Sequence, residues 1–147
     1  MFKCILLPTD GSRVAAKAVK AGLALAKETG GRVIGYYALE AIPHAYYGDI
    51  YALSQNAVKG LERCGREAGV EHLAKVKKMA DAAGVAFEAV MTSVSSAHAG
   101  IVDAAKKHKC DVIFMASYGR SGVSRVIMGS VMQKVLTHSK VPVLVYR

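Results

Sequence analysis

The segment from 117 to 130 combines glycines, arginines and a closing serine, which are residue types suited to binding phosphate. A glycine has no Cβ, so its backbone N–H can approach a ligand closely. The serine stands where the next helix is expected to begin, and helix N-termini attract anions. These residues are Gly119, Arg120, Gly122, Arg125, Gly129 and Ser130. The pattern indicates either an anion cradle or an ordinary glycine loop that leads into a capped helix.

A second candidate segment runs from Pro8 to Ser12, directly after an apolar stretch. The carboxylate of Asp10 stands at a strand end, where it either accepts ribose hydroxyls or reaches a metal ion. The same residue in an Asp-Gly-Ser turn is also typical of helix N-terminal capping. Both interpretations of Asp10 stay open from the sequence.

The chain lacks the usual motifs of nucleotide-hydrolysing enzymes. It contains no G-x-x-x-x-G-K-[ST] sequence, which excludes a P-loop NTPase. The five histidines show no metal-ligand spacing, and no acidic residue follows Asp111. Only Asp10 is then available to activate a water near a phosphate chain, so the sequence predicts binding or slow hydrolysis rather than efficient turnover. No catalytic residue and no metal ligand is assigned.

Apolar runs and helical spacings alternate along the chain and predict the elements that must position these residues. The predicted strands are 4–7, 32–39, 85–92, 111–116 and 141–146, and the predicted helices are 14–30, 58–84, 97–109 and 130–137. The segment 40–55 is irregular and rich in tyrosine, which indicates a loop. Regular alternation of this kind predicts a single α/β domain with an open parallel five-stranded sheet and helices on both faces.

In open parallel sheets, ligands bind outside the carboxyl ends of the strands, where the strand order reverses. This rule points to the segments 8–11, 37–39 and 117 onward. The tyrosines around Tyr37 either stack on a purine or pack the irregular loop against the sheet.

Length and composition exclude several classes of protein. The 147 residues fit one domain, at about 100 to 200 residues per domain. Three cysteines without a C-x-x-C pair argue against a disulfide framework, and the short apolar start resembles neither a signal peptide nor a membrane span. The protein is therefore expected in the cytoplasm, with no membrane partner.

The formal net charge of +9 arises from 20 Lys+Arg against 11 Asp+Glu. Such an excess fits nucleic acid, an anionic small molecule or simple solubility. No nucleic-acid recognition motif is present, so nucleic acid is an unlikely partner by sequence. The segment after Asp111 contains no acidic residue and includes the glycine loop. This favours a local positive potential that attracts phosphates.

Three segments together resemble the universal stress protein family across the whole chain, 1–147. They are Pro-Thr-Asp-Gly-Ser at 8–12, the Gly119-x9-Gly129-Ser130 spacing, and the ending Val-Leu-Thr-His-Ser-Lys-Val-Pro-Val-Leu-Val at 135–145. The resemblance implies a Rossmann-like fold of the adenine nucleotide alpha hydrolase type. It also implies a homodimer that pairs through the final strand, Val141 to Tyr146.

ATP-binding members of this family carry Gly-x2-Gly-x9-Gly followed by Ser or Thr, and here Ala116 replaces the first glycine. Its methyl group would either crowd the ligand or strain the turn if that position needed a positive φ. The resemblance implies binding of ATP or another adenine nucleotide in a stress or signalling module, with Mg²⁺ between the phosphates. The alternative is a member that binds no nucleotide and acts as a dimeric interaction module. The residues expected at the nucleotide are Pro8, Thr9, Asp10, Tyr37, Met115, Ala116, Gly119, Arg120, Gly122, Gly129, Ser130, Val131 and Met132.

Overall fold

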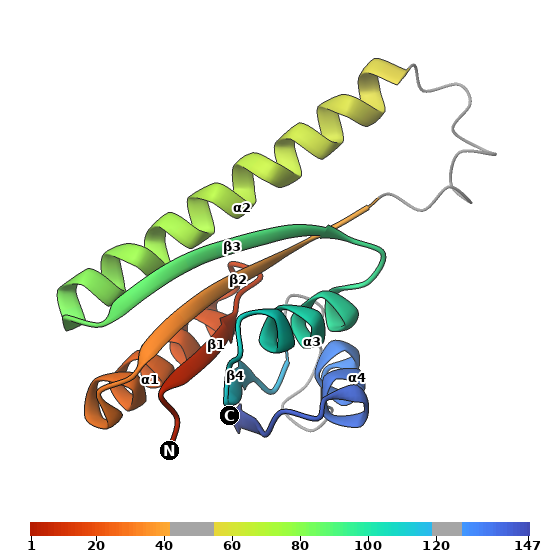
Figure 1. Ribbon diagram of the computed structural model, residues 1–147. Helices are drawn as coiled ribbons and strands as arrows, with labels where there is room; N and C mark the ends of the chain where they lie inside the picture. Colours follow the sequence, from red (N-terminus) through yellow and green to blue (C-terminus); the bar gives the residue numbers. More distant parts are fainter. Residues whose placement is uncertain (42–54, 119–127) are drawn as a thin grey trace.

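The computed structural model describes residues 1–41, 55–118 and 128–147. Its strands and helices alternate along the chain, and the strands form one parallel sheet of five in the order β3-β2-β1-β4-β5 (Figure 1). The elements are β1 (Cys4–Pro8), α1 (Arg13–Thr29), β2 (Arg32–Glu40), α2 (Gln55–Ala83), β3 (Ala86–Val94), α3 (Ala97–Lys107), β4 (Val112–Ala116), α4 (Ser130–His138) and β5 (Val143–Tyr146). The predicted α/β fold with a parallel five-stranded sheet is confirmed.

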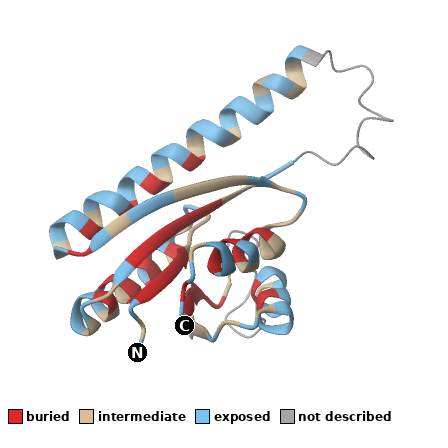
Figure 2. Ribbon diagram, viewed as in Figure 1, coloured by how far each residue is buried: buried red, intermediate tan, exposed pale blue. Residues whose placement is uncertain are grey.

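The two faces of the sheet are covered by different pairs of helices. Successive side chains of a strand point to opposite faces, so alternate residues of β1 enter separate cores. Ile5 and Leu7 pack with α1 and α2, whereas Cys4 and Leu6 pack with α3 and α4. Figure 2 shows the buried residues concentrated on the central strands and on the inner faces of these helices.

Helix α1 begins and ends with residue types that are typical of helix caps. The Ser12 hydroxyl accepts a hydrogen bond from the Ala15 N–H at 3.1 Å, as an N-cap serine does. Gly30 ends the helix in the left-handed region at φ 60°, a conformation that glycine adopts without steric cost. Local sequence signals therefore determine both ends of this helix.

The outer strands differ from the expectation of apolar strands covered on both faces. No residue of β3 or β5 is buried, although every residue of β4 is. The reason is position, because β3 and β5 lie at the two edges of the sheet and only one neighbouring strand pairs with each. The final strand also begins at Val143 rather than Val141, since a turn around the Ser139 hydroxyl holds the Val141 backbone.

Strands β1 and β4 join the first and second parts of the chain at the middle of the sheet. The Asp111 N–H donates to the Cys4 carbonyl at 2.9 Å, just before β4 begins. The Asp111 carboxylate accepts the Lys3 N–H at 2.7 Å, across 108 residues of sequence. This junction completes the sheet.

Within the described residues, no helix is long and apolar enough to cross a membrane.

Cys4 and Cys110 are buried and their sulfur atoms lie 3.4 Å apart, while Cys64 is exposed. Burial is the largest cause that raises the pKa of the Cys110 thiol, and the hydrogen bond with Cys4 adds to it. Burial likewise raises the pKa of Tyr36. Both groups therefore stay neutral in the folded protein at pH values where the unfolded chain ionises them.

The free energy of unfolding is expected to fall as pH rises above 9.0, the ordinary pKa of a cysteine thiol. Above that value the unfolded chain releases the Cys110 proton first, which favours unfolding. Urea denaturation at about pH 8 and about pH 10.5 measures the loss. Cys110→Ala should reduce the loss between the two pH values, and the matched control Cys64→Ala should keep it. An equal loss in Cys110→Ala would contradict the assignment.

Candidate functional site

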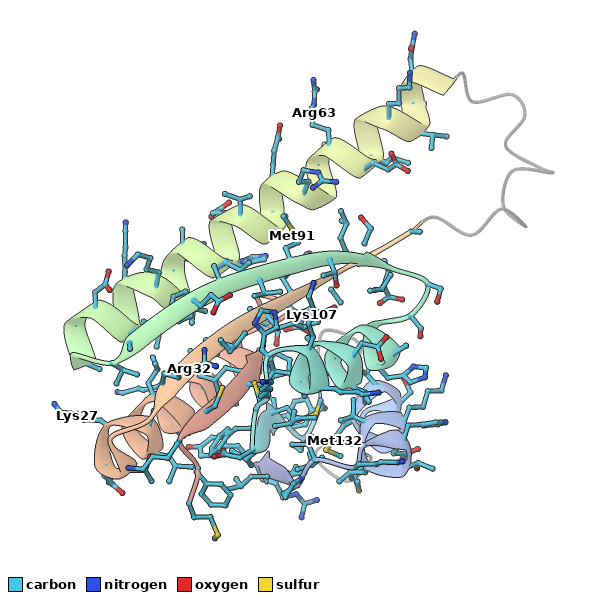
Figure 3. The ribbon with its side chains drawn as sticks, in the orientation of Figure 1. Lys27, Arg32, Arg63, Met91, Lys107 and Met132 are labelled. Atoms are coloured by element: carbon cyan, nitrogen blue, oxygen red, sulfur yellow. The ribbon has the colours of Figure 1, made fainter. Side chains whose placement is uncertain are left out.

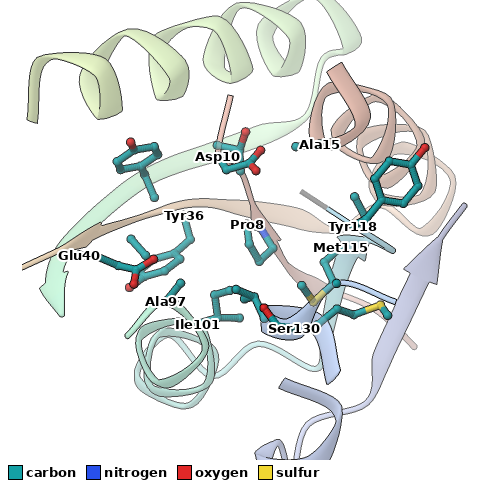
Figure 4. A pocket seen from close by; sticks show the side chains of 17 residues that line it. Pro8, Asp10, Ala15, Tyr36, Glu40, Ala97, Ile101, Met115, Tyr118 and Ser130 are labelled. Carbon is teal, nitrogen blue, oxygen red and sulfur yellow. The ribbon is translucent and has the colours of Figure 1, made fainter. Parts of the chain in front are cut away.

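A cavity of about 290 Å³ lies at the carboxyl ends of β1, β2 and β4 (Figure 4). Strand β1 has β2 on one side and β4 on the other, so the chain order along the sheet reverses here. Such a reversal leaves a crevice between helices of opposite faces, which is the usual ligand position in this class of sheet. The cavity is lined by Pro8, Thr9, Asp10, Ala15, Tyr36, Tyr37, Ala38, Glu40, Ala97, Ile101, Met115, Ala116, Tyr118, Gly129, Ser130, Val131 and Met132.

Every predicted site residue that the structure describes lines this cavity. Those residues are Pro8, Thr9, Asp10, Tyr37, Met115, Ala116, Gly129, Ser130, Val131 and Met132. The remaining predicted residues, Gly119, Arg120 and Gly122, lie outside the described residues, as does Arg125. The structure thus brings together segments that are more than a hundred residues apart in sequence.

The loop after β1 is held in shape by short-range hydrogen bonds. The Ser12 N–H donates to Asp10 Oδ1 at 2.9 Å, and the Gly11 N–H donates to Thr9 Oγ1 at 3.2 Å. Gly11 has a φ of +77°, and a Cβ at this position would overlap the His72 ring. The loop needs a glycine here for both reasons. His72 of α2 thereby sets how close the loop lies to the helix.

Asp10 has a structural part in this loop and a place in the cavity wall. Its carboxylate accepts the backbone N–H two residues ahead, as an Asx turn does, while Ser12 is the N-cap of α1. Asp10 also lines the cavity. Helix α1 is therefore capped by Ser12 rather than by Asp10, whose carboxylate supports the cap residue and also lies at the cavity.

The N-terminus of α4 opens at the cavity without a side-chain cap. Gly129 is the N-cap residue, and a glycine has no side chain that could accept a hydrogen bond from the first turn. An uncapped first turn leaves backbone N–H groups available to an anion. The Gly129 N–H itself donates to the Ser117 carbonyl at 2.9 Å, so this predicted phosphate donor is already engaged. Ser130, Val131 and Met132, which form the start of this turn, line the cavity.

Apolar side chains form the deeper wall of the cavity. Ile101 of α3 and Met115 of β4 are 4% and 7% exposed, and Met132 of α4, labelled in Figure 3, is 1% exposed. The Tyr36 hydroxyl bonds Thr92 Oγ1 at 2.6 Å, which fixes its ring at the same wall. A flat aromatic or purine surface fits such a lining.

Tyr37 lies on the α2 side of the sheet. Its ring centre is 5.9 Å from that of His72, and a Cβ at Gly69 would lie 2.7 Å from its Cδ1 atom. Only 9% of Tyr37 is exposed, so much of its ring is engaged in packing between β2 and α2. This favours a backbone contribution of Tyr37 to the cavity over stacking of its ring.

The charges of the described lining are negative. Asp10 and Glu40 line the cavity, and no lysine, arginine or histidine does so among the described residues. Two carboxylates oppose the binding of a polyphosphate unless a cation compensates for them. Oxygen ligands of this kind suit Mg²⁺, which binds through one or two carboxylates together with substrate phosphates. Asp10 and Glu40 are thus chemically suited to a metal-bound phosphate chain.

Ala116 causes no backbone strain in place of the family glycine. It is the last residue of β4, and the only non-glycine residues with positive φ among those described are Phe2 and Lys109. The possible strain at this position is therefore excluded. Its methyl group remains part of the cavity wall.

Sequence reasoning did not name several lining residues. They are Ala15, Tyr36, Glu40, Ala97 and Ile101, together with Ala38 and Tyr118, which fall inside the predicted segments 37–39 and 117 onward. Most are small or apolar and look like ordinary core positions of a helix or strand. Tyr36 and Glu40 were within reach, because they flank the predicted segment 37–39.

Comparison with known proteins agrees with this architecture. The model of the universal stress protein family matches residues 1–147. "Universal stress protein MJ0531" of Methanocaldococcus jannaschii is 33% identical over 147 residues, which cover 100% of this chain and 83% of that protein. The solved structure of "hypothetical protein MJ0577" has a TM-score of 0.81 at 27% identity and covers 99% of this chain and 95% of its own.

Two more distant structures share the fold and carry nucleotides. A universal stress protein in complex with cAMP has a TM-score of 0.74 at 21% identity, with 99% of this chain and 97% of that chain covered. The universal stress protein from Archaeoglobus fulgidus in complex with dAMP has a TM-score of 0.70 at 15% identity, with 100% and 98% covered. With a family model that matches from the first residue to the last, this chain belongs to the universal stress protein family.

Proposed function

We propose that this protein binds an adenine nucleotide in the cavity at the β1–β4 junction and acts as a stress-response or signalling module with little or no hydrolysis. The observation that carries the proposal is the combination, in one cavity, of an apolar, aromatic wall with the N-terminus of α4, whose N-cap residue is the glycine Gly129. The wall suits a purine and the helix terminus suits a phosphate. The cAMP and dAMP complexes of proteins with this fold support the same ligand class.

ATP with Mg²⁺ is the proposed form of the ligand. The carboxylates of Asp10 and Glu40 would hold the metal side of the phosphate chain, and the N–H groups of Ser130 and Val131 would contact phosphate oxygens. Mg²⁺ would supply the positive charge that the described lining lacks. Efficient hydrolysis is not proposed, because the Asp10 carboxylate is already engaged as a turn acceptor.

Calorimetric titration with ATP and Mg²⁺ is expected to show saturable binding of one nucleotide per chain. Ala116→Val should weaken binding at least about tenfold, because two added methyl groups enter the cavity. The matched control Ala89→Val places the same change on an exposed position of β3 and should bind normally. Absence of heat with ATP, AMP and cAMP at millimolar concentration would overturn the proposal.

The second candidate function is a dimeric interaction module that binds no nucleotide. It is favoured by Ala116 in place of the motif glycine. Titration of the wild type and of Ala116→Gly distinguishes the two candidates. In the first, the wild type binds nucleotide and Ala116→Gly preserves or strengthens binding, whereas in the second the wild type does not bind.

We also propose a homodimer that pairs through β5. This strand is apolar, half-buried and at the edge of the sheet, and an unpaired apolar edge favours a partner strand. Light scattering should then report a mass of two chains of 15.6 kDa each. The Val145→Lys variant should have the mass of one chain. A wild-type protein that has the mass of one chain would contradict the dimer.

A further inference from the structure

Helices α3 and α4 bring two histidines together on a surface outside the cavity. The ring centres of His98 and His138 lie 5.4 Å apart with their planes inclined at 45°. His98 is half-buried near the start of α3, and His138 is exposed at the end of α4. Neither residue lines the nucleotide cavity.

The hydrogen bond of His138 determines which of its ring nitrogens carries the proton. Nδ1 lies 2.7 Å from the Lys134 carbonyl oxygen, one helical turn earlier. A carbonyl oxygen only accepts, so Nδ1 must be the donor. In the neutral ring, the lone pair is then on Nε2. Histidines that bind metals are usually oriented in this way, with one nitrogen bonded to a backbone carbonyl and the other free to ligate.

The spacing of the two rings fits joint coordination of one metal ion. With Zn–N bonds of about 2.0–2.1 Å and tetrahedral angles, two imidazoles on one ion have ring centres about 5 Å apart. The observed 5.4 Å between the ring centres is close to this value. The two helices already pack together, since Ile101 of α3 and Met132 of α4 belong to the same core.

We propose that His98 and His138 form a two-histidine binding site for a divalent late transition metal, with Zn²⁺ as its representative. Imidazole nitrogen is a preferred ligand of Zn²⁺, Cu²⁺ and Ni²⁺. Among the described residues, no third His, Cys, Asp or Glu completes a group around such an ion, so water fills the other positions. The site is thus open and exchangeable rather than a closed structural site.

A metal ion at this site would connect the two helices that border the nucleotide cavity. Ala97 next to His98 and Ser130 at the start of α4 both line that cavity. An ion that holds α3 to α4 would restrict their relative movement and so stabilise the folded chain. Metal binding at the two histidines does not require a nucleotide in the cavity.

Zn²⁺ titration by calorimetry tests the site in the full chain carrying Cys64→Ser, which removes the exposed thiol. We expect one Zn²⁺ per chain, and at least about tenfold weaker binding in His98→Gln and in His138→Gln. The matched control is His108→Gln, at the opposite end of α3, where the ring faces Glu88 at 3.5 Å. That variant should bind Zn²⁺ like its parent.

Thermal unfolding supplies a second readout that separates lost binding from lost folding. Zn²⁺ should raise the unfolding midpoint of the parent and of His108→Gln. It should not raise the midpoint of His98→Gln or His138→Gln. Without metal, the midpoints of these two variants should match that of the parent. Binding that persists in both His98→Gln and His138→Gln would overturn the site. A stoichiometry of half an ion per chain would overturn its location within one chain.

Discussion

Replacing Gly100 with alanine is expected to weaken adenine-nucleotide binding at least about tenfold and to lower the free energy of unfolding by about 1–3 kcal/mol. Gly100 is buried in α3, where a Cβ would overlap the Tyr36 hydroxyl and come within 2.8 Å of Val94 Cγ1. The helix must then move away from the sheet or Tyr36 must give up its bond to Thr92. Either change displaces the wall of the cavity, because Tyr36 and the first turn of α3 line it.

Gly60→Ala is the matched control for this substitution. Gly60 lies inside α2, and an added Cβ would meet nothing within 4 Å. Alanine should therefore stabilise the protein by about 0.5–1 kcal/mol through its helix propensity alone and leave binding unchanged. Removing the hydroxyl with Tyr36→Phe should partly rescue Gly100→Ala in both stability and affinity. If the free-energy changes of the two single variants add up to that of the double variant, contact with Tyr36 is not the cause of the destabilisation.

Leu7→Ala should lower the free energy of unfolding by about 3–5 kcal/mol, the largest effect that we expect from a single truncation. Leu7 lies in the central strand with 0% of its surface exposed and packs in the core shared by α1 and α2. Its Cδ atoms occupy the space that a side chain at Gly22 of α1 would fill: a Cβ there would overlap Cδ2 and lie 3.3 Å from Cδ1. The position of Gly22 therefore has no room for a side chain while Leu7 is present.

This pairing predicts a strong non-additive effect. Gly22→Ala alone should destabilise by about 1–3 kcal/mol through overpacking. In the presence of Leu7→Ala, the same change should cost little or become stabilising, because the space is empty. Urea denaturation of the four proteins of the double-mutant cycle measures the coupling. Strictly additive free energies would show that the two residues do not share that space.

The fold was predictable because its signals are local. The serine before α1 and the glycine after it each mark a helix boundary, and the structure confirms both. The apolar run at 4–7 marks the first strand, although β1 extends one residue further, to Pro8. The burial of the strands was less predictable. An edge strand such as β3 shows the same residue types as a half-covered inner strand, and only the order of the strands separates them.

The candidate site was predictable where residue type carries chemistry, as at Asp10 and Ser130. It was not predictable where the wall consists of ordinary core residues. Ile101 occupies a position on the inner face of α3 that the pattern assigns to packing alone. His98 and His138 are 40 residues apart and belong to different helices, so no spacing in the sequence relates them. Their proximity follows only from the packing of α3 on α4.

The junction of β1 with β4 has a consequence for how the chain acquires its cavity. Its contacts join residues 108 positions apart, so β1, α1 and β2 can assemble long before β4 is available. At about 5–20 residues per second, several seconds of ribosomal synthesis separate the two events, and the free edge of β1 stays open to mispairing meanwhile. The cavity is complete only when Met132 has emerged. Any ligand of this cavity therefore stabilises only the full-length folded chain and cannot assist strand pairing in its first half.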